Sequence, residues 1–216
     1  MKAVQVKICG LTNEEDTRWV VNLGADYVGV NFCAESPRKV SVEKAAEIVA
    51  GLPSFVKAVG VFMNPDLVEL KKILKKVPLQ FLQLHGDEMP ELLGKIKADF
   101  QIPIWKAIRV ENEDSLKKIS DYVGTVHTLL LDAYKPGQPG GTGETFDWAL
   151  AVKAKEYGIP IFLAGGLRPD NVLDAMKAVE PAGVDVASGV EKEGHPKKKD
   201  AEKMKVFIGR AKGMMK

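Results

Sequence analysis

The chain has 216 residues, of which 45% are hydrophobic and 28% are charged, the balance of a soluble globular protein that can bury a large core. Its 31 basic and 29 acidic side chains leave a formal net charge of +2, so charge gives no reason to expect a nucleic acid or an anionic membrane as partner. Any anion-binding site must therefore be local.

The two cysteines, Cys9 and Cys33, are too few for a disulfide framework. Neither belongs to a Cys/His cluster, so we expect no metal site. Polar residues interrupt the apolar ones near the N-terminus, so we expect a strand there and no signal peptide. Because the chain also lacks an apolar run long enough to span a bilayer, we expect a cytoplasmic protein.

Eight short apolar segments alternate with longer amphipathic stretches along the chain. Their β-branched and aliphatic residues form nearly continuous runs, which is typical of parallel strands covered on both faces. Eight such strands with helical spacers predict a single (β/α)8 barrel over residues 1–216, and an open flavodoxin-like sheet explains the count less well. The predicted strands are Val4–Ile8, Tyr27–Val30, Val56–Phe62, Gln80–Leu84, Ile104–Ile108, Thr128–Leu131, Pro160–Leu163 and Gly183–Ala187.

Three short sequences predict where helices begin. Thr12–Glu15 has a capping-box pattern, and Asn64-Pro65 places a cap residue before a proline at the first helical position. Arg168-Pro169-Asp170 has the same form, although arginine is a poor cap. We expect the basic segment Lys197–Lys199 to be a solvated helix start.

The loops that follow the strands carry the chemistry in a barrel of this kind. Cys9 follows the first predicted strand and Asp132 the sixth, so the two form a candidate acid/base pair across the barrel mouth. A free thiol ionises near pH ~8.5, so Cys9 needs a nearby cation or helix terminus to act as a base. Taken singly, Cys9 could be an inert apolar residue and Asp132 a helix cap. We interpret Cys33 as a bystander.

Two dipeptides that contain glycine follow the seventh and eighth predicted strands, at the usual phosphate-binding corner of the barrel. They are Gly165-Gly166 and Ser188-Gly189, and glycine lets backbone N–H groups approach a phosphate closely. Each pair alone could serve only a tight turn, but both at one corner favour phosphate binding. The segment Gly137–Gly143, which includes Gly141, lacks the GK[ST] ending of a P-loop. It could cover the site or add donors to the same phosphate.

Other polar residues extend this candidate site. Arg38 can pair with a ligand carboxylate, or be an ordinary surface arginine. His85 is a candidate substrate-binding residue, although a single histidine is more often structural. Lys7 points to the same side of its strand as Cys9, so its ammonium group needs a buried partner. The eighth strand neighbours the first in a closed barrel, so we predict an internal pair between Lys7 and Asp185.

Seven motifs, in order over nearly the whole chain, resemble those of the phosphoribosylanthranilate isomerases of tryptophan biosynthesis. Each motif is weak alone, and together they are specific. They are Val6–Leu11, Ser36–Arg38, Gln83–Gly86, Leu130–Asp132, Gly140–Gly143 with Phe146–Trp148, Leu163–Leu167 and Gly183–Glu191.

The resemblance implies an Amadori rearrangement of N-(5-phosphoribosyl)anthranilate to 1-(2-carboxyphenylamino)-1-deoxyribulose 5-phosphate. It implies that Asp132 is the general acid that opens the ribose ring and that Cys9 takes the proton from C2. It further implies that Arg38 holds the anthranilate carboxylate and the glycine turns hold the phosphate. This chemistry needs no metal and no cofactor, and its partner is a small sugar phosphate. A monomer and a homodimer both remain open.

Three other functions compete with this interpretation. An indole-glycerol-phosphate synthase would use a catalytic lysine and glutamate and an extra N-terminal segment. A ribulose-phosphate epimerase would use metal-binding histidines, and the chain has 3 histidines in all. A non-catalytic barrel that binds a phosphate ligand would keep the glycine corner and need neither Cys9 nor Asp132.

Overall fold

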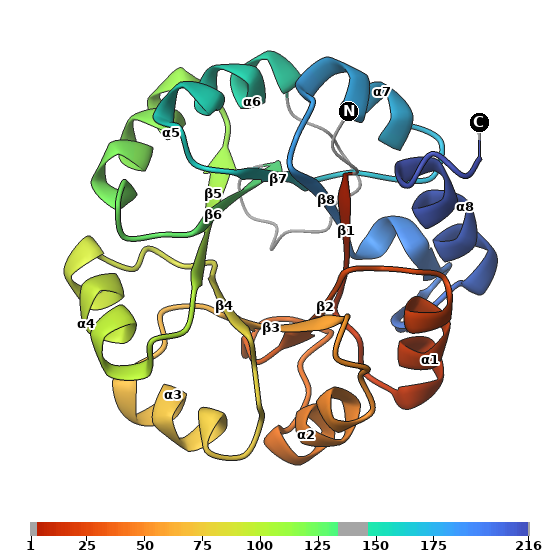
Figure 1. Ribbon diagram of the computed structural model, residues 1–216, viewed down its shortest axis with the longest axis horizontal. Coiled ribbons are helices and arrows are strands. Elements are labelled where there is room, and N and C mark those ends of the chain that lie inside the picture. Colours follow the sequence, from red (N-terminus) through yellow and green to blue (C-terminus); the bar gives the residue numbers. More distant parts are fainter. Residues whose placement is uncertain (1–3, 134–146, 216) are drawn as a thin grey trace.

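Eight parallel strands close into a barrel in sequence order, and helices surround it (Figure 1). The structure is a computed structural model that describes residues 4–133 and 147–215. The closed sheet confirms the predicted barrel, and each predicted strand lies within one or two residues of an observed one. The strands are β1 (Gln5–Cys9), β2 (Tyr27–Asn31), β3 (Lys57–Phe62), β4 (Phe81–Leu84), β5 (Ile104–Val110), β6 (Thr128–Ala133), β7 (Ile161–Leu163) and β8 (Gly183–Val186).

Helices follow the strands and turn their apolar sides to the sheet. The α-helices are α1 (Glu14–Asn22), α2 (Val42–Ala50), α3 (Leu67–Leu74), α4 (Pro90–Phe100), α5 (Glu113–Lys117), α6 (Trp148–Ala154), α7 (Val172–Val179) and α8 (Ala201–Ala211). Short 3-10 helices are η1 (Lys118–Tyr122), η2 (Lys155–Tyr157) and η3 (Ser188–Val190). Between η3 and α8 lies an antiparallel hairpin of β9 (Glu191–Lys192) and β10 (His195–Lys199).

The start of α1 lies one residue later than the Thr12 capping box predicts. Asn13 is the cap, because its side chain accepts a hydrogen bond from the Asp16 backbone N–H at 2.8 Å. The Thr12 hydroxyl instead donates to the Lys197 carbonyl oxygen at 2.6 Å. Thr12 therefore ties the first loop to the β9–β10 hairpin.

The other two predicted helix starts are wrong. Asn64 has a left-handed φ of 48°, and its backbone N–H donates to Glu88, so it cannot cap the next helix. Asp66 caps α3 instead. The Arg168–Asp170 segment forms a turn in which the Arg168 N–H donates to the Asn171 side chain, and α7 begins later, at Val172.

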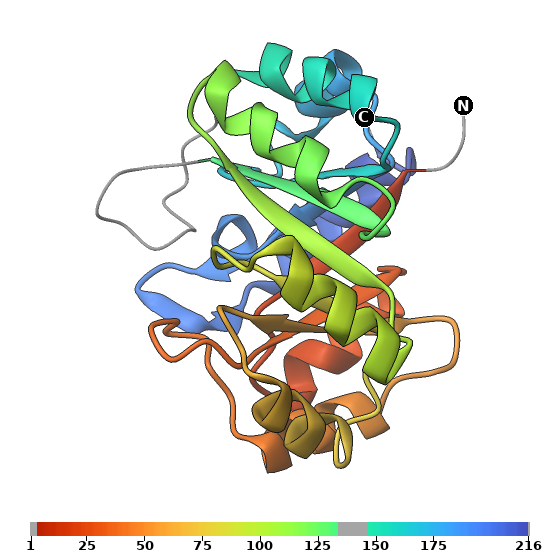
Figure 2. The same ribbon diagram turned by 90° about the vertical axis from the view of Figure 1, so that its left-hand side faces the viewer.

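The basic segment Lys197–Lys199 is also not a helix start, because it forms part of β10. Lys199 is 2% exposed, and its ammonium group lies 2.9 Å from a carboxylate oxygen of Glu191. The hairpin thus carries a buried cation, whereas three consecutive lysines predict a solvent-exposed segment. It lies at the same end of the barrel as the loop that follows β2 (Figure 2).

The barrel interior holds an aromatic layer separate from the main core between strands and helices. Tyr27, Trp105 and Phe162 contact one another there, with ring centroids 4.4 to 5.6 Å apart. Fully burying such a ring contributes on the order of 3 kcal/mol. This layer closes the bottom of the barrel below the polar residues at the carboxyl ends of the strands.

Candidate active site

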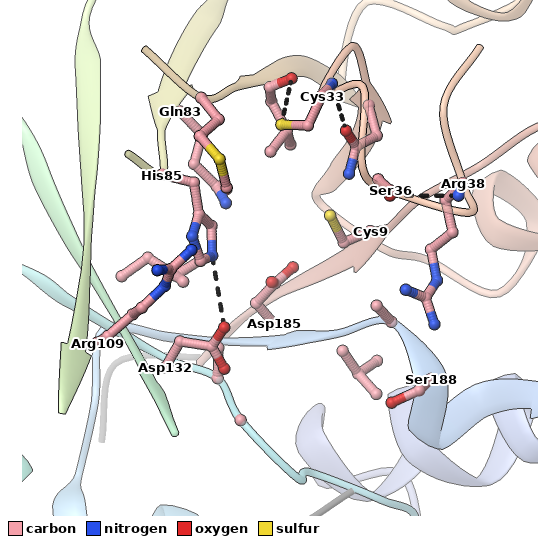
Figure 3. A pocket seen from close by; sticks show the side chains of 18 of the residues that line it. Cys9, Cys33, Ser36, Arg38, Gln83, His85, Arg109, Asp132, Asp185 and Ser188 are labelled. Carbon is pink, nitrogen blue, oxygen red and sulfur yellow. Dashed lines mark hydrogen bonds and ion pairs between the residues drawn. The ribbon is translucent and has the colours of Figure 1, made fainter. Parts of the chain in front are cut away.

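A pocket opens at the carboxyl ends of the barrel strands (Figure 3). Cys9, at the end of β1, and Asp132, near the end of β6, both line it from different walls. Gly189 is not among its lining residues, and Gly141 lies outside the described residues. The other predicted site residues that line it are Arg38, His85, Gly165, Gly166 and Ser188.

Cys9 is a largely buried thiol in close contact with β2. Its residue is 8% exposed, and a Cβ added to Gly29 would lie 2.7 Å from the Cys9 Sγ. Gly29 therefore leaves room for the sulfur. Burial raises the pKa of the Cys9 thiol, and the nearby Lys7 ammonium opposes that effect. The site thus contains a thiol whose ionisation depends on its neighbours.

The predicted pair between Lys7 and Asp185 is confirmed. Lys7 and Asp185 are register partners in β1 and β8, and their charged atoms lie 2.8 Å apart. Lys7 is completely buried, directly above the aromatic layer. The alternation of side chains along β1 places Lys7 and Cys9 on the same inner face.

Asp132 is held between His85 and the loop after β7. The Nε2 atom of His85 lies 3.4 Å from Asp132 Oδ2, as Figure 3 shows. On its other side, a Cβ added to Gly165 would lie 2.9 Å from Asp132 Oδ1 and 2.2 Å from the Ala133 nitrogen. The carboxyl group of Asp132 therefore lies beside the His85 imidazole, and the backbone at Gly165 restricts its position.

Arg38 is not an ordinary surface arginine, because its side chain is 11% exposed and makes two hydrogen bonds to one carboxylate. Its Nε and Nη2 atoms donate to the two carboxylate oxygens of Glu191, at 2.6 and 2.8 Å. Lys199 approaches the same carboxylate. Two cations share one anion, so this arginine cluster, formed by Arg38, Glu191 and Lys199, carries a net positive charge beside the pocket.

The loops after β7 and β8 meet at the predicted glycine corner. Gly165 and Gly166 have left-handed φ values of 75° and 66°, which glycine adopts without strain. A Cβ added to Gly189 would lie 2.0 Å from the Leu167 carbonyl oxygen. Glycine at these positions thus permits close backbone packing, and the corner borders the pocket through Gly165, Gly166 and Ser188.

The second cysteine, Cys33, also borders the pocket but differs from Cys9. Its sulfur donates a hydrogen bond to the Val61 carbonyl oxygen at 3.7 Å. Burial, reinforced by nearby negative groups, raises the pKa of its thiol to about 12. Cys33 therefore stays protonated near neutral pH, in keeping with the bystander interpretation.

The sequence interpretation missed Glu191 and Lys199 as neighbours of Arg38, and Gln83 as part of the pocket wall. Gln83 is 2% exposed, and its side-chain oxygen has no hydrogen-bond partner within the described part of the chain. Strand alternation could have indicated Gln83, because it precedes His85 by two positions. No sequence signal links Glu191 to Arg38, which lies 153 positions away.

A closed β/α barrel with a pocket at the carboxyl ends of its strands, lined by titratable side chains, is the architecture of the β/α-barrel enzymes. Residues 6–210 match the family model described as N-(5'-phosphoribosyl)anthranilate (PRA) isomerase. The chain belongs to the N-(5'-phosphoribosyl)anthranilate isomerase family, which confirms the resemblance. The isomerase from Geobacter metallireducens is 46% identical over 209 residues, which cover 97% of this chain and 99% of that relative.

Solved structures agree with this assignment. The phosphoribosylanthranilate isomerase from Thermotoga maritima matches with a TM-score of 0.89 and 41% identity, over 97% of this chain and 99% of that one. Another structure, 41% identical with a TM-score of 0.85 over the same shares of the two chains, is described as monomers of the dimeric Thermotoga enzyme. A third is a complex with reduced 1-(o-carboxyphenylamino)-1-deoxyribulose 5-phosphate, with a TM-score of 0.86, 40% identity and the same coverage.

Proposed function

We propose that this chain catalyses the Amadori rearrangement of N-(5-phosphoribosyl)anthranilate to 1-(2-carboxyphenylamino)-1-deoxyribulose 5-phosphate, a step of tryptophan biosynthesis. The observation that carries the proposal is that Cys9 and Asp132 line one pocket together with Arg38 of the arginine cluster and with Gly165, Gly166 and Ser188 of the glycine corner. Membership of the isomerase family supports the same reaction.

Asp132 is the general acid in this proposal. Its carboxyl group protonates the ribose ring oxygen, so the C1–O bond breaks and a C1–N iminium ion forms. In this proposal His85, 3.4 Å away, assists in supplying the proton. An acid at this point contributes on the order of 10²–10⁴-fold to the rate.

Cys9 is the general base. Its thiolate takes the proton from C2, and the electron pair of the broken C–H bond neutralises the iminium nitrogen. The resulting enol becomes the C2 ketone when C1 gains a proton and the C2 hydroxyl group loses one. No electrons leave the substrate, because the oxidation at C2 balances the reduction at C1.

In this proposal two anion sites hold the two acidic groups of the substrate. Arg38, which lines the pocket, binds the anthranilate carboxylate through charge-assisted hydrogen bonds in this proposal. The corner formed by Gly165, Gly166, Ser188 and Gly189 binds the phosphate through backbone N–H groups. The ligand named in the complex of the relative carries both a carboxyphenyl group and a phosphate, which supports two such sites. We expect Gly141 to contribute further donors.

Paired substitutions test these roles. We expect Cys9→Ala and Asp132→Asn each to lower kcat by about 10²-fold or more. Both should still bind the reduced product analogue, as measured by calorimetry. Cys33→Ala makes the same change at the other thiol and should keep most of the turnover. Unchanged turnover in Cys9→Ala and Asp132→Asn would favour the non-catalytic phosphate-binding barrel.

We further propose that residues 1–216 form one barrel domain and that the chain forms a homodimer. The single closed sheet supports the first statement, and the dimeric Thermotoga relative supports the second. Light scattering after gel filtration distinguishes a dimer from the 23.6 kDa monomer.

A cytoplasmic location remains a prediction that cell fractionation can test. In the described residues, no helix has the length and apolar character needed to span a bilayer.

A further inference from the structure

Lys7 is a buried cation to which the proposed reaction assigns no role. Its side chain is completely buried, 2.8 Å from Asp185 and 6.0 Å from the centre of the Trp105 ring. Transfer of two charges from water costs several kcal/mol per ion, and an apolar pair of similar volume is often no less stable. Stability alone therefore does not explain why a lysine lies at this position.

The Lys7 ammonium group also lies beside the Cys9 sulfur. A Cβ added to Gly29 would lie 2.7 Å from Cys9 Sγ and 3.2 Å from Lys7 Nζ, so both atoms border the same small space. Gly29 is the register partner of Cys9 in the adjacent strand β2. Because glycine leaves this space open, the ammonium charge acts on the sulfur at short range.

We propose that Lys7 is a positioning residue that holds a positive charge against the Cys9 sulfur, so that the thiolate can form and act as the base. Asp185 holds Lys7 in place and limits how much of its charge the sulfur experiences. The inference rests on the proposed role of Cys9 in the reaction. Burial raises the pKa of Cys9, and the Lys7 ammonium opposes it more strongly than any other neighbouring group.

Charged and titratable groups face Cys9 from several elements. Asp185 on β8 disfavours the thiolate, whereas Lys199 on β10 favours it less strongly than Lys7 does. Their order of influence makes Lys7 the position where a substitution should have the largest effect. The remaining groups that line the pocket are Cys33, Glu35, Arg38, His85, Arg109 and Asp132.

The rate of Cys9 alkylation by iodoacetamide, measured against pH in a Cys33→Ser background, reports the ionisation of a single thiol. We expect Lys7→Met to move the midpoint of this curve to higher pH, because a positive charge is lost. Asp185→Asn should move it to lower pH, because the ammonium group loses its counter-charge. Opposite shifts of the alkylation midpoint in the two variants follow from the opposite charges removed. A general loss of packing would move both midpoints in the same direction.

Lys199→Met is the matched control, because it also removes a buried ammonium group and should give a smaller upward shift. The inference is overturned by a midpoint that stays or falls in Lys7→Met, or that stays or rises in Asp185→Asn. If circular dichroism shows that Lys7→Met does not fold, the direction of the Asp185→Asn shift decides alone.

Turnover separates this inference from the proposed function. In Lys7→Met we expect the low-pH limb of the kcat profile to move with the alkylation midpoint, and kcat at pH 7 to fall by about tenfold or more. Full turnover in Cys9→Ala would reject the proposed base while leaving the charge effect measurable. An inactive Cys9→Ala combined with an unmoved alkylation midpoint in Lys7→Met would reject the role of Lys7 alone.

Discussion

Arg38 and Glu191, 153 positions apart in the sequence, form a two-pronged ion pair in which Arg38 Nε and Nη2 donate to both carboxylate oxygens. This geometry orients the planar guanidinium group, whose Nη1 atom takes no part in the ion pair, and Arg38 also lines the pocket. Lys199 supplies a second cation to the same carboxylate. The hairpin that carries Glu191 and Lys199 therefore positions the proposed carboxylate anchor.

Glu191→Gln should weaken substrate binding more than it slows the chemical step. The variant keeps one hydrogen-bond acceptor but loses the charge that orients Arg38, so we expect KM to rise about tenfold, the equivalent of about 1.4 kcal/mol. We expect kcat to change by less than threefold. Steady-state kinetics measure both, and Glu193→Gln, on the exposed part of the same hairpin, is the control. Equal losses in both variants would contradict the positioning role of Glu191.

Gly189→Ala should disturb the phosphate corner. Its new methyl group would lie 2.0 Å from the Leu167 carbonyl oxygen, so one of the two loops must move. We expect KM, and the inhibition constant for inorganic phosphate, to rise by about tenfold, since the backbone donors shift together. Inhibition by phosphate measures this directly. A rise in KM with unaltered phosphate inhibition would show that the corner does not hold the phosphate.

Gly94→Ala should stabilise the protein without affecting activity. Gly94 lies inside α4, and a Cβ there meets no atom within 4 Å. Alanine loses less conformational entropy than glycine in a helix, so we expect the free energy of unfolding to rise by about 0.5–1 kcal/mol. Urea denaturation measures the change. A loss of stability would show that the added methyl group meets an unfavourable contact.

Glu88→Gln should destabilise the protein at neutral pH and much less in acid. Glu88 and Lys106 form a buried ion pair at 2.9 Å, and breaking such a pair costs about 3–5 kcal/mol. Burial by itself would raise the pKa of Glu88, but Lys106 and backbone N–H groups outweigh it and hold the pKa below its ordinary value.

A lowered pKa in the folded state means that ionised Glu88 stabilises the fold above its unfolded value of about 4.3. That contribution is lost as the pH falls through the folded pKa, so the difference between Glu88→Gln and the unaltered protein should shrink in the same range. Urea denaturation at several pH values measures it. Glu43→Gln, at the exposed Lys76 pair, is the control and should change stability little. A difference that persists in acid would contradict this account.

Periodic features of the sequence were enough to locate the strands and one internal contact. Strand alternation placed Lys7 and Cys9 on one face, and barrel closure placed Asp185 beside Lys7, as the 2.8 Å pair confirms. The helix starts were less predictable. Asn64 resembles a cap, but a distant carboxylate, Glu88, binds its backbone, so tertiary contacts override the local preference.

By itself, the sequence determined the barrel, the order of its strands and which residues lie at their carboxyl ends, because hydrophobic periodicity and strand alternation are local properties of the chain. Tertiary structure alone decided that the lysine run at 197–199 enters a hairpin and that Lys199 is buried against Glu191. It also decided that Glu191 binds Arg38. Those contacts join segments far apart in the chain, and their stability depends on desolvation and charge balance, which exist only once the loops have packed together.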